Sequence, residues 1–407
     1  MDKQLIVAGL DLGTSAIKCV IGVRHEDGRV DVLGTGTHPA RGLQQGTVCD
    51  QEQAVASIRA AVEEAELMAG CEIKEVFLAV SGRHIESFNS HGMVRIRNQS
   101  VDAEDVRACI DMARAVRLPP DQQILHVVPQ EYLIDGQTGI ARPLGMNGVR
   151  LEVHAHLITG HTESLLALED CCKRARLKVL DVMHAPLAQA EVLLTPQGRD
   201  LGVVLIDIGG DTTNIAVFDR GEVVHTSIIG LGGEHVTRDV RDCLNAPLVE
   251  AEHLKQSRGC ALAELIDPEE MVEIPGVGGR KPRRIERQLL CQIVEARVDE
   301  IFHLVSEELH RLGYTEGLRG GAVLTGGTAN LPGAIELAEH VLHMPAAKGE
   351  PKALHGLVDV VKNPRYATGT GLVLCGVRQR QQAWFSARLE KPRSRGFGRI
   401  ASLFGFA

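Results

Sequence analysis

The chain has 407 residues, a formal net charge of −9 at pH 7, and a composition that is 44% apolar and 24% charged. This length supplies material for two to four compact units, each large enough to bury a core of its own. The acidic balance, with no basic stripe in the body of the chain, argues against a general nucleic-acid-binding protein. The ten cysteines are dispersed without a CxxC motif, which suits a reducing cytosol better than a disulfide framework.

The N-terminus does not have the pattern of a signal peptide, because MDKQLIVAGLDLG carries charges in and around a short apolar run. No uninterrupted apolar stretch reaches the roughly 18–20 residues that a membrane-spanning helix requires. The sequence therefore predicts a cytoplasmic protein whose contact with a membrane is peripheral.

The first predicted elements are two strands joined by an acidic, glycine-bearing turn, in GLDLGTSAIKCVIGV at 9–23. A P-loop or a GxGxxG motif leads from a strand into a helix, whereas β-branched residues continue after this turn. Glycine lets the backbone approach an anion closely, with its N–H groups directed at it. Asp11 would repel a phosphate there unless a divalent cation stood between them. A single turn of this kind is also explained by a plain hairpin.

A helix at 50–69 and a strand at 75–81 come next, and then residues 83–160 change in texture. IESFNSHGMVRIRN is predicted to be a hairpin, DAEDVRACIDMARAV a capped helix, and QILHVVPQEYLID and VRLEVHAHLITG strands. Together they predict an inserted β-α-β-β subdomain. His154 and His156 share one strand face and could bind a metal, but no third ligand has a recognisable spacing, so surface or packing histidines are the favoured interpretation.

The second half of the chain repeats the opening pattern. After predicted helices at 161–176 and 185–195, VLIDIGGDTTNIAVFD at 204–219 again has an acidic glycine turn between apolar runs. Its residues Asp207, Gly209, Asp211 and Asn214 stand in register with Asp11, Gly13, Ser15 and Lys18. Two turns in matching register favour a duplicated α/β core with a nucleotide in the cleft. Asp11 and Asp207 would then grip one Mg²⁺ through water from two sides.

The remaining elements are predicted to be mostly helical. GGEHVTRDVRDCL and LVEAEHLKQS indicate helices, and a long amphipathic helix at 285–312 is closed by Gly313. GGAVLTGGTANLPGAIELAEHVL at 320–342 predicts a strand, a Gly326–Gly327 turn and a helix. The small residues of that turn would let a flat ring or a ribose lie against the backbone. A last helix is predicted at 364–382, beginning at Pro364.

These features resemble the actin/Hsp70/sugar-kinase nucleotide fold, and the chain closely resembles the FtsA family of bacterial actin-like cell-division proteins over nearly its full length. The resemblance is carried by SGRHIESFNSHGMVRI, ILHVVPQEYLIDGQTGIARPLGMNGVRLEVHAHLITG, LGVVLIDIGGDTTNIAVF, VGGRKPRRIERQ and VLTGGTANLPG. It implies an α/β, actin-like fold of the duplicated ribonuclease H-like kind, with two lobes and the inserted subdomain. The expected parts are subdomain 1A at 1–82 and 161–195, 1C at 83–160, 2A at 196–230 and 306–385, 2B at 231–305, and a linker with an amphipathic membrane-targeting tail at 386–407.

The resemblance also implies ATP and Mg²⁺ in the cleft. The cofactor-binding residues predicted with it are Asp11, Gly13, Thr14, Ser15, Lys18, Asp207, Gly209, Gly210, Asp211, Thr212, Thr213, Gly232, Gly233, Glu252, Lys255, Gly326, Gly327 and Thr328. Glu252 and Lys255 inherit contacts to the adenosine from the family pattern in AEHLK, and at i and i+3 they share a helix face. A surface charge pair is the alternative interpretation.

Two features depart from the patterns of the relatives. The second turn reads GGDTTN where the family commonly has GGGTTD, so Asp211 adds a negative charge near the phosphates and Asn214 removes one. MHAPLAQAEVLL matches the connecting helix that carries a carboxylate or amide near the attacking water in ATPase relatives. Ala185 stands where the chaperone ATPases have a glutamate, so ATP binding without fast hydrolysis is predicted.

The C-terminal end has a composition of its own, KPRSRGFGRIASLFGFA. Phe397, Ile400, Leu403 and Phe404 fall at helical spacing on one face, with Arg395 and Arg399 beside them. Ten residues are too few for a stable helix in water, but an anionic membrane surface can induce one. FtsA relatives end in such a segment, which predicts a weak, reversible membrane contact that strengthens when many tails belong to one assembly. A tail packed on its own domain is the alternative.

The predicted function is that of an adaptor in septum assembly. The resemblance implies a protein that binds ATP, self-associates as a filament or oligomer on the inner face of the bacterial cell membrane at the division site, anchors the tubulin-like FtsZ, and recruits later division proteins. In the family the FtsZ C-terminal peptide binds the small lobe, here about 231–305, where Arg283 and Arg297 could pair with an acidic peptide. Solvated helix charges explain these arginines as well. A pilus-assembly actin homologue and a small-molecule kinase remain alternative functions.

Overall fold

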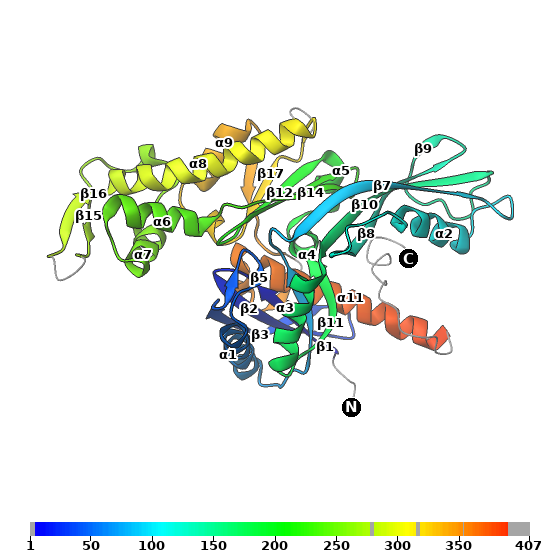
Figure 1. The fold of residues 1–407 in the computed structure, drawn as a ribbon, viewed down its shortest axis with the longest axis horizontal. Helices are drawn as coiled ribbons and strands as arrows, with labels where there is room; N and C mark the ends of the chain where they lie inside the picture. The colour runs from blue at the N-terminus through cyan, green and yellow to red at the C-terminus, as the bar shows by residue number, and fades with distance from the viewer. Residues whose placement is uncertain (1–4, 277–280, 315–317, 353, 390–407) are drawn as a thin grey trace.

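The computed structural model describes residues 5–276, 281–314, 318–352 and 354–389. A first lobe, a second lobe and an insert are each built on a sheet of their own (Figure 1). The predicted membrane residues Arg395, Phe397, Arg399, Ile400, Leu403 and Phe404 lie outside the described residues. Within the described ranges, no helix combines the length and the apolarity needed to cross a membrane.

The first lobe is a six-stranded sheet in the order β11–β6–β1–β2–β3–β19. Its strands are β1 (Leu5–Leu12), β2 (Ala16–Arg24), β3 (Val30–Pro39), β6 (Glu75–Val80), β11 (Lys178–His184) and β19 (His355–Gly356). The apolar runs around the first turn become β1 and β2, which pair antiparallel and whose Leu10, Ile17 and Ile21 are fully buried. β6 runs parallel to β1, and β11 runs parallel to β6.

The helix predicted at 50–69 is α1 (Gln51–Ala69), which packs on β3 and β2. Asp50 caps its first turn by accepting a hydrogen bond from the Gln53 N–H, and Gly70 ends it in the left-handed conformation. Its alanines let the helix press onto glycines of β3, since a Cβ at Gly36 would overlap the carbonyl of Ala61. The close approach of the α1 backbone to β3 therefore fixes the position of α1 on the sheet.

The second lobe repeats the strand plan of the first. Its sheet has the order β14–β13–β12–β17–β18, from β12 (Val203–Ile208), β13 (Thr213–Asp219), β14 (Glu222–Ile229), β17 (Ala322–Thr325) and β18 (Ala346–Lys348). β12 pairs antiparallel with β13 and parallel with β17, as β1 pairs with β2 and β6. The duplicated α/β fold predicted from the two acidic turns is thereby confirmed.

Helices and a small hairpin complete the second lobe. They are α6 (Gly233–Leu244), α7 (Leu248–Arg258), α8 (Arg287–Arg311), α9 (Ala334–Leu342) and the β15 (Met271–Ile274) and β16 (Arg283–Glu286) pair. The long helix predicted at 285–312 begins two residues later, because its first residues belong to β16. Gly313 follows it at φ 80°, as expected of a closing glycine.

The insert is a four-stranded sheet in the order β7–β10–β8–β9, covered by α2 (Ala103–Arg114). Its strands are β7 (Ile85–Arg95), β8 (Gln122–Ile134), β9 (Gln137–Ile140) and β10 (Arg150–His161). The hairpin predicted in IESFNSHGMVRIRN is wrong: this segment is one long strand along β10. Gly92 makes no turn there, and its missing side chain lets α2 approach, because a Cβ would overlap the carbonyl of Cys109. β9 is a short strand added to the predicted β-α-β-β order.

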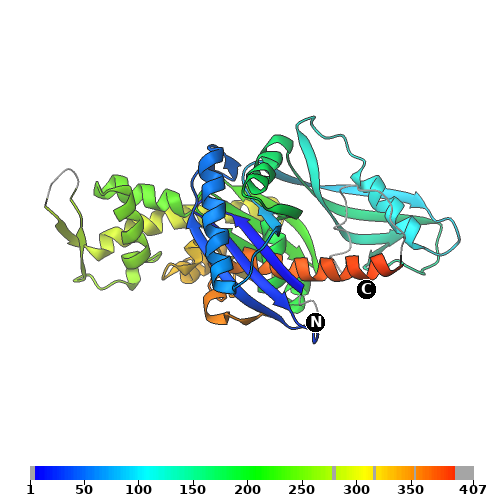
Figure 2. The same cartoon turned by 90° about the horizontal axis from the view of Figure 1, so that it is seen from below.

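The assignment of 306–385 to the second lobe needs correction at its end. The predicted last helix starts as a 3₁₀ turn at Pro364–Tyr366 and continues as α11 (Ala367–Leu389). α11 packs on β1 and on α4 (Ala185–Leu193) of the first lobe, whose core its buried residues join. Small residues make this possible, since a Cβ at Gly371 would overlap the Ala188 carbonyl. α11 then runs out from the first lobe toward the side of the insert (Figure 2).

Candidate functional site

The two acidic turns meet face to face between the lobes. The Asp211 N–H donates to Thr14 Oγ1 at 3.1 Å. A Cβ at Gly210 would lie 2.9 Å from Ser15 Cβ, so only glycine permits this approach without displacement. The structure thus places side by side two turns that are far apart in the sequence.

The first turn carries an ion pair. Asp11 and Lys18 are opposite each other in the β1–β2 register, and Lys18 Nζ lies 3.0 Å from Asp11 Oδ2. Both side chains are largely buried, which strengthens their attraction relative to a surface pair. Gly13 closes the bend, and a Cβ there would lie 2.7 Å from the Ala16 carbonyl oxygen.

Asp207 of the second turn is a buried carboxylate held by amides. Its Oδ2 accepts hydrogen bonds from Gln189 Nε2 at 2.8 Å and from Asn214 Nδ2 at 3.1 Å. Burial raises the pKa of Asp207, and the negative charge of Asp11 raises it further. The Gln189 hydrogen bond, the charge of Lys18 and the Asn214 hydrogen bond lower this pKa but do not cancel the rise. Asp11 and Asp207 therefore interact electrostatically across the lobes. The excess negative charge there suits a divalent cation.

The third predicted turn lies against the second. Gly326 has φ 83°, and a Cβ there would lie 2.5 Å from Asp207 Oδ1 and equally close to the Ile208 carbonyl oxygen. Gly327, by contrast, faces open space, with no atom within 4 Å of a Cβ built on it. The open face at Gly327 fits the flat group that the sequence predicts for the Gly326–Gly327 turn.

The predicted adenosine contacts form a further cluster beside these turns. Lys255 Nζ lies 2.6 Å from Glu252 Oε2 and donates to the Gly233 carbonyl at 3.0 Å and to Thr237 Oγ1 at 2.9 Å. A Cβ at Gly233 would lie 2.7 Å from Thr328 Oγ1, so α6, α7 and the third turn converge here. Burial raises the pKa of Glu252, but the charge and hydrogen bonds of its neighbours, Lys255 first, outweigh this and leave it below its usual value.

The remaining predicted cofactor residues, Gly209, Thr212, Thr213 and Gly232, stabilise the conformation of the second turn. The Gly209 N–H donates to the Thr212 carbonyl at 2.9 Å, and Thr213 Oγ1 donates to the Leu231 carbonyl at 2.9 Å. A Cβ at Gly232 would lie 2.5 Å from the Gly210 carbonyl oxygen. The predicted phosphate, metal and adenosine residues are therefore contiguous in space.

Sequence reasoning does not identify several residues that contact this cluster. Gln189, which bonds Asp207, lies one helical turn after Ala185 on α4, in the segment that matches the connecting helix. The Gln45 N–H and the Ser81 hydroxyl of the first lobe donate hydrogen bonds to Asp211 and Asn214 of the second. Nothing in the local sequence marks Gln45 or Ser81, because their importance comes from the meeting of distant segments, whereas Gln189 is an amide in the segment that matches the connecting helix.

The two arginines predicted to bind a partner are both tied to α6. Arg283 Nη2 donates to the Leu244 carbonyl at 2.6 Å. Arg297 binds Asp239 with two nitrogens, at 2.6 and 3.1 Å. The guanidinium of Arg297 therefore already has a carboxylate partner within the chain, and the structure does not bring the two arginines into direct contact.

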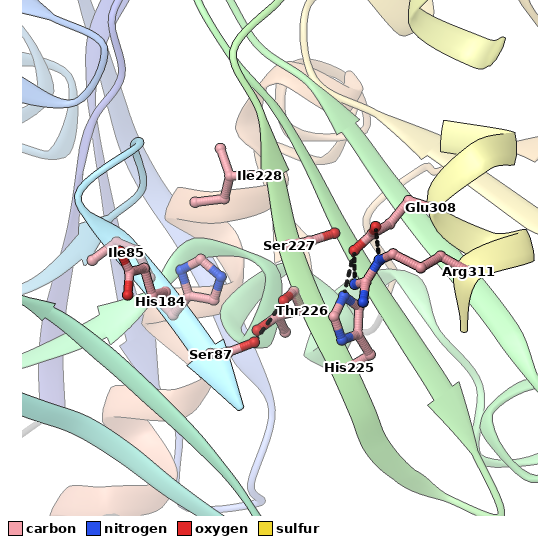
Figure 3. Close-up of a pocket in the computed structure, with 10 residues that line it drawn as sticks. Ile85, Ser87, His184, His225, Thr226, Ser227, Ile228, Glu308 and Arg311 are labelled. Atoms are coloured by element: carbon pink, nitrogen blue, oxygen red, sulfur yellow. Dashed lines mark hydrogen bonds and ion pairs between the residues drawn. The ribbon is translucent and has the colours of Figure 1, made fainter. Parts of the chain in front are cut away.

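A separate crevice of about 300 Å³ lies where the two lobes and the insert meet (Figure 3). Residues of β7, β14 and α8 line it together with His184, the last residue of β11. His184 Nδ1 lies 3.4 Å from the Val80 carbonyl oxygen, while its buried Nε2 has no hydrogen-bond partner among the described residues. Figure 3 shows His184 and His225 on opposite walls of the crevice.

The two histidines of β10 are engaged by protein groups. His156 is fully buried and bonds Asn89 Oδ1 at 2.7 Å and Thr226 Oγ1 at 3.0 Å. His154 is partly exposed and pairs with Glu131 at 3.0 Å. Among the described residues there is no cluster of three or more side chains suited to holding a metal ion.

Comparison with known proteins places this geometry in context. Residues 204–371 match the family model for cell division protein FtsA, and residues 82–159 match the model for the SHS2 domain inserted in FtsA. The chain is 45% identical over 374 residues to cell division protein FtsA of Pseudomonas aeruginosa, covering 92% of this chain and 90% of the relative.

Solved structures support the fold. The type IV pilus biogenesis complex PilM–PilN aligns with a TM-score of 0.67 at 15% identity, over 91% of this chain and 98% of that one. MreB5 of Spiroplasma citri bound to AMPPNP aligns with a TM-score of 0.56 at 14% identity, over 94% of this chain and all of that one. The fold is actin-like.

Proposed function

Because the chain belongs to the FtsA family of cell-division proteins, we propose that it is an ATP-binding adaptor of the division machinery. It self-associates on the cytoplasmic face of the inner membrane at the division site, anchors FtsZ there, and recruits later division proteins. The observation that carries the nucleotide part of this proposal is the contact between the two acidic turns, with Asp11 and Asp207 electrostatically coupled across it.

In the proposed complex, Asp11 and Asp207 hold Mg²⁺ through water, and the N–H groups of the two glycine turns bind the phosphates. The Gly326–Gly327 turn and the Glu252–Lys255 pair receive the adenosine. Bound Mg²⁺ offsets the negative charge of the phosphates and of both carboxylates. The likeness to an actin-like protein whose structure contains AMPPNP supports a nucleotide in this cleft.

The proposal does not include fast hydrolysis. Ala185 begins α4 and offers no carboxylate at the position where the chaperone ATPases have one. Gln189, the polar side chain one turn later, uses its amide nitrogen on Asp207 and on Thr368 Oγ1 at 2.9 Å. A protein that binds ATP and hydrolyses it slowly, if at all, is the expected behaviour.

Calorimetric titration with ATP tests the nucleotide site. We expect binding by the wild-type protein that requires Mg²⁺ and is lost in Asp11→Ala. Absence of heat at millimolar ATP with Mg²⁺ would contradict the proposal. Transfer of phosphate from ATP to a panel of metabolites would instead favour a small-molecule kinase.

Pelleting with anionic liposomes tests the adaptor role. The full chain is expected to sediment with the liposomes and to carry an FtsZ C-terminal peptide with it, whereas a chain ending at residue 390 stays in solution. Equal sedimentation of the full chain and the shortened chain would contradict a membrane-binding role of the tail. Arg283→Glu and Arg297→Glu test the proposed peptide surface at 231–305, and unchanged peptide affinity in both would move the partner site elsewhere.

A further inference from the structure

Asp211 makes contacts that a glycine at the same position cannot make. Its carboxylate is buried, with 7% of the side chain exposed. Oδ2 accepts a hydrogen bond at 3.1 Å from the N–H of Gln45, which lies in the β4 (Leu43–Gln44) to β5 (Thr47–Val48) turn of the first lobe. Oδ1 lies 3.7 Å from the guanidinium of Arg238 on α6. The side chain therefore joins the first lobe to the second.

Asn214 makes a second contact between the lobes. Its Oδ1 accepts a hydrogen bond at 2.7 Å from Ser81 Oγ, at the end of β6. Its Nδ2 donates to Asp207 Oδ2 at 3.1 Å. An aspartate at 214 would put a second carboxylate against Asp207, which is unfavourable without a cation between them. Asparagine instead donates a hydrogen bond to this carboxylate.

These contacts use groups that an incoming nucleotide would also need. The backbone N–H of Asp211 is bonded to Thr14, and the carboxylate of Asp211 occupies an anion position beside the phosphate turns. A further acid lies close by: burial raises the pKa of Glu234, and the charge of Asp211 raises it more. A triphosphate entering here meets negative charge and must part the two turns.

From this arrangement we propose that Asp211 and Asn214 form an interlobe latch that holds the two lobes together at the acidic turns and lowers the affinity of the site between them for ATP. The latch consists of the Gln45–Asp211 and Ser81–Asn214 hydrogen bonds. The effect on ATP rests on the proposed nucleotide site, whereas the contact between the lobes does not depend on it. ATP binds only after the contacts of Asp211 are released.

The test compares Asp211→Ala and Asp211→Asn with wild type in the full-length protein. Alanine removes the carboxylate without the added chain entropy of glycine. Asparagine keeps an oxygen for the Gln45 N–H but removes the charge. Asp242→Asn, on an exposed carboxylate of α6, is the matched control for charge. Each protein is measured by thermal unfolding without nucleotide and by calorimetric titration with Mg²⁺-ATP.

Asp211→Ala is expected to melt several degrees below Asp242→Asn without nucleotide, and Asp211→Asn is expected to lie between them. Both Asp211 variants are expected to bind ATP about tenfold more tightly than wild type or more, as removal of a nearby like charge implies. Equal melting temperatures of Asp211→Ala and Asp242→Asn overturn the latch whether or not ATP binds. Equal ATP affinities in proteins that all bind overturn its effect on affinity. No binding by any of the four proteins instead contradicts the proposed function.

Discussion

At the scale of single residues, the buried carboxylate of Asp207 makes the stability of the folded protein depend on pH. Its pKa is raised in the folded protein, chiefly by burial, so the folded state keeps a proton over a pH range in which the unfolded chain has lost it. Stability therefore falls as pH rises from the unfolded value of about 3.8 through that range. Above it, the buried charge continues to cost free energy.

Asp207→Asn is accordingly expected to raise the melting temperature at pH 7, by about 1 °C for each 1 kcal/mol relieved in a chain of this length. The asparagine retains an oxygen for the amides of Gln189 and Asn214. The gain is expected to shrink as pH is lowered toward 4, and Mg²⁺-dependent ATP binding is expected to be lost. Thermal unfolding between pH 4 and 8 measures this, with the exposed Asp111→Asn as control. A gain in melting temperature that increases as pH falls would contradict the raised pKa of Asp207.

Substitutions at two glycines of the site are expected to affect stability and ATP affinity differently. Gly210→Ala places a methyl group 2.9 Å from Ser15 Cβ and is expected to cost about 1–3 kcal/mol of stability. Gly327→Ala meets no atom within 4 Å and has helical dihedral angles, so the nucleotide-free protein should melt as wild type does. Its methyl group would nevertheless occupy the face proposed for the adenosine. Unchanged ATP affinity in Gly327→Ala would place the nucleotide base elsewhere.

The residues of this cleft are foreseeable only in part. Asp11, Asp207 and the glycines stand in local patterns, and their matching register is enough to indicate the duplication. Gln45 and Ser81 carry no such pattern, and Gln189 is indicated only by the match of its helix. All three matter because the turn after β4, the end of β6 and α4 are brought to the second turn by tertiary packing. Asp211 and Asn214 stand out in the sequence as departures, but their partners cannot be deduced from it.

At the scale of elements, small residues decide which surfaces meet. α11 crosses α4 at Gly371, where backbone packs against backbone. Gly371→Ala should favour the isolated helix by up to about 1 kcal/mol. The overlap with Ala188 is expected to outweigh this and to give a net loss of roughly 1–3 kcal/mol in chemical denaturation. Gly198→Ala in α5 (Pro196–Leu201), where the nearest atom is the Thr195 hydroxyl at 3.3 Å and no backbone atom lies in the way, is expected to cost much less than Gly371→Ala. Equal stability of the two variants would contradict the close crossing of α11 and α4 at Gly371.

Such contacts explain which elements the sequence predicts correctly. The apolar periods around both turns and the capped helix after Asp50 are local properties, and the structure agrees with them. The glycine in IESFNSHGMVRIRN suggests a turn, whereas Gly92 instead makes room for α2. The lobe to which α11 belongs is also a tertiary property, since a helix rich in small residues can press against either sheet.

At the scale of the whole molecule, a group of buried histidines lies where the lobes and the insert join. Burial lowers the pKa of His84 and His184 to about 4, and that of His126 and His156 to about 3. Neighbouring imidazoles lower these values further, as His225 does for His156. His225 itself pairs with Glu308 on the wall of the crevice in Figure 3. The junction is therefore built from neutral imidazoles.

These depressed pKa values fix the sign of the acid response. Between pH 6.5 and about 4 the unfolded chain binds protons on these histidines that the folded protein does not, so stability is lost as pH falls through that window. Each buried histidine contributes about 1.4 kcal/mol per pH unit once pH is well below 6.5. In the wild-type protein His126 Nε2 accepts a hydrogen bond from the backbone N–H of His184 at 2.9 Å. Glutamine in His126→Gln keeps an acceptor for this N–H but cannot titrate. We expect it to flatten the dependence of unfolding free energy on pH between 6.5 and 5, whereas the exposed His253→Gln keeps the wild-type slope. If His126→Gln retained the full slope, His126 would bind protons alike in the folded and unfolded protein, which would contradict its burial as a neutral imidazole at this junction.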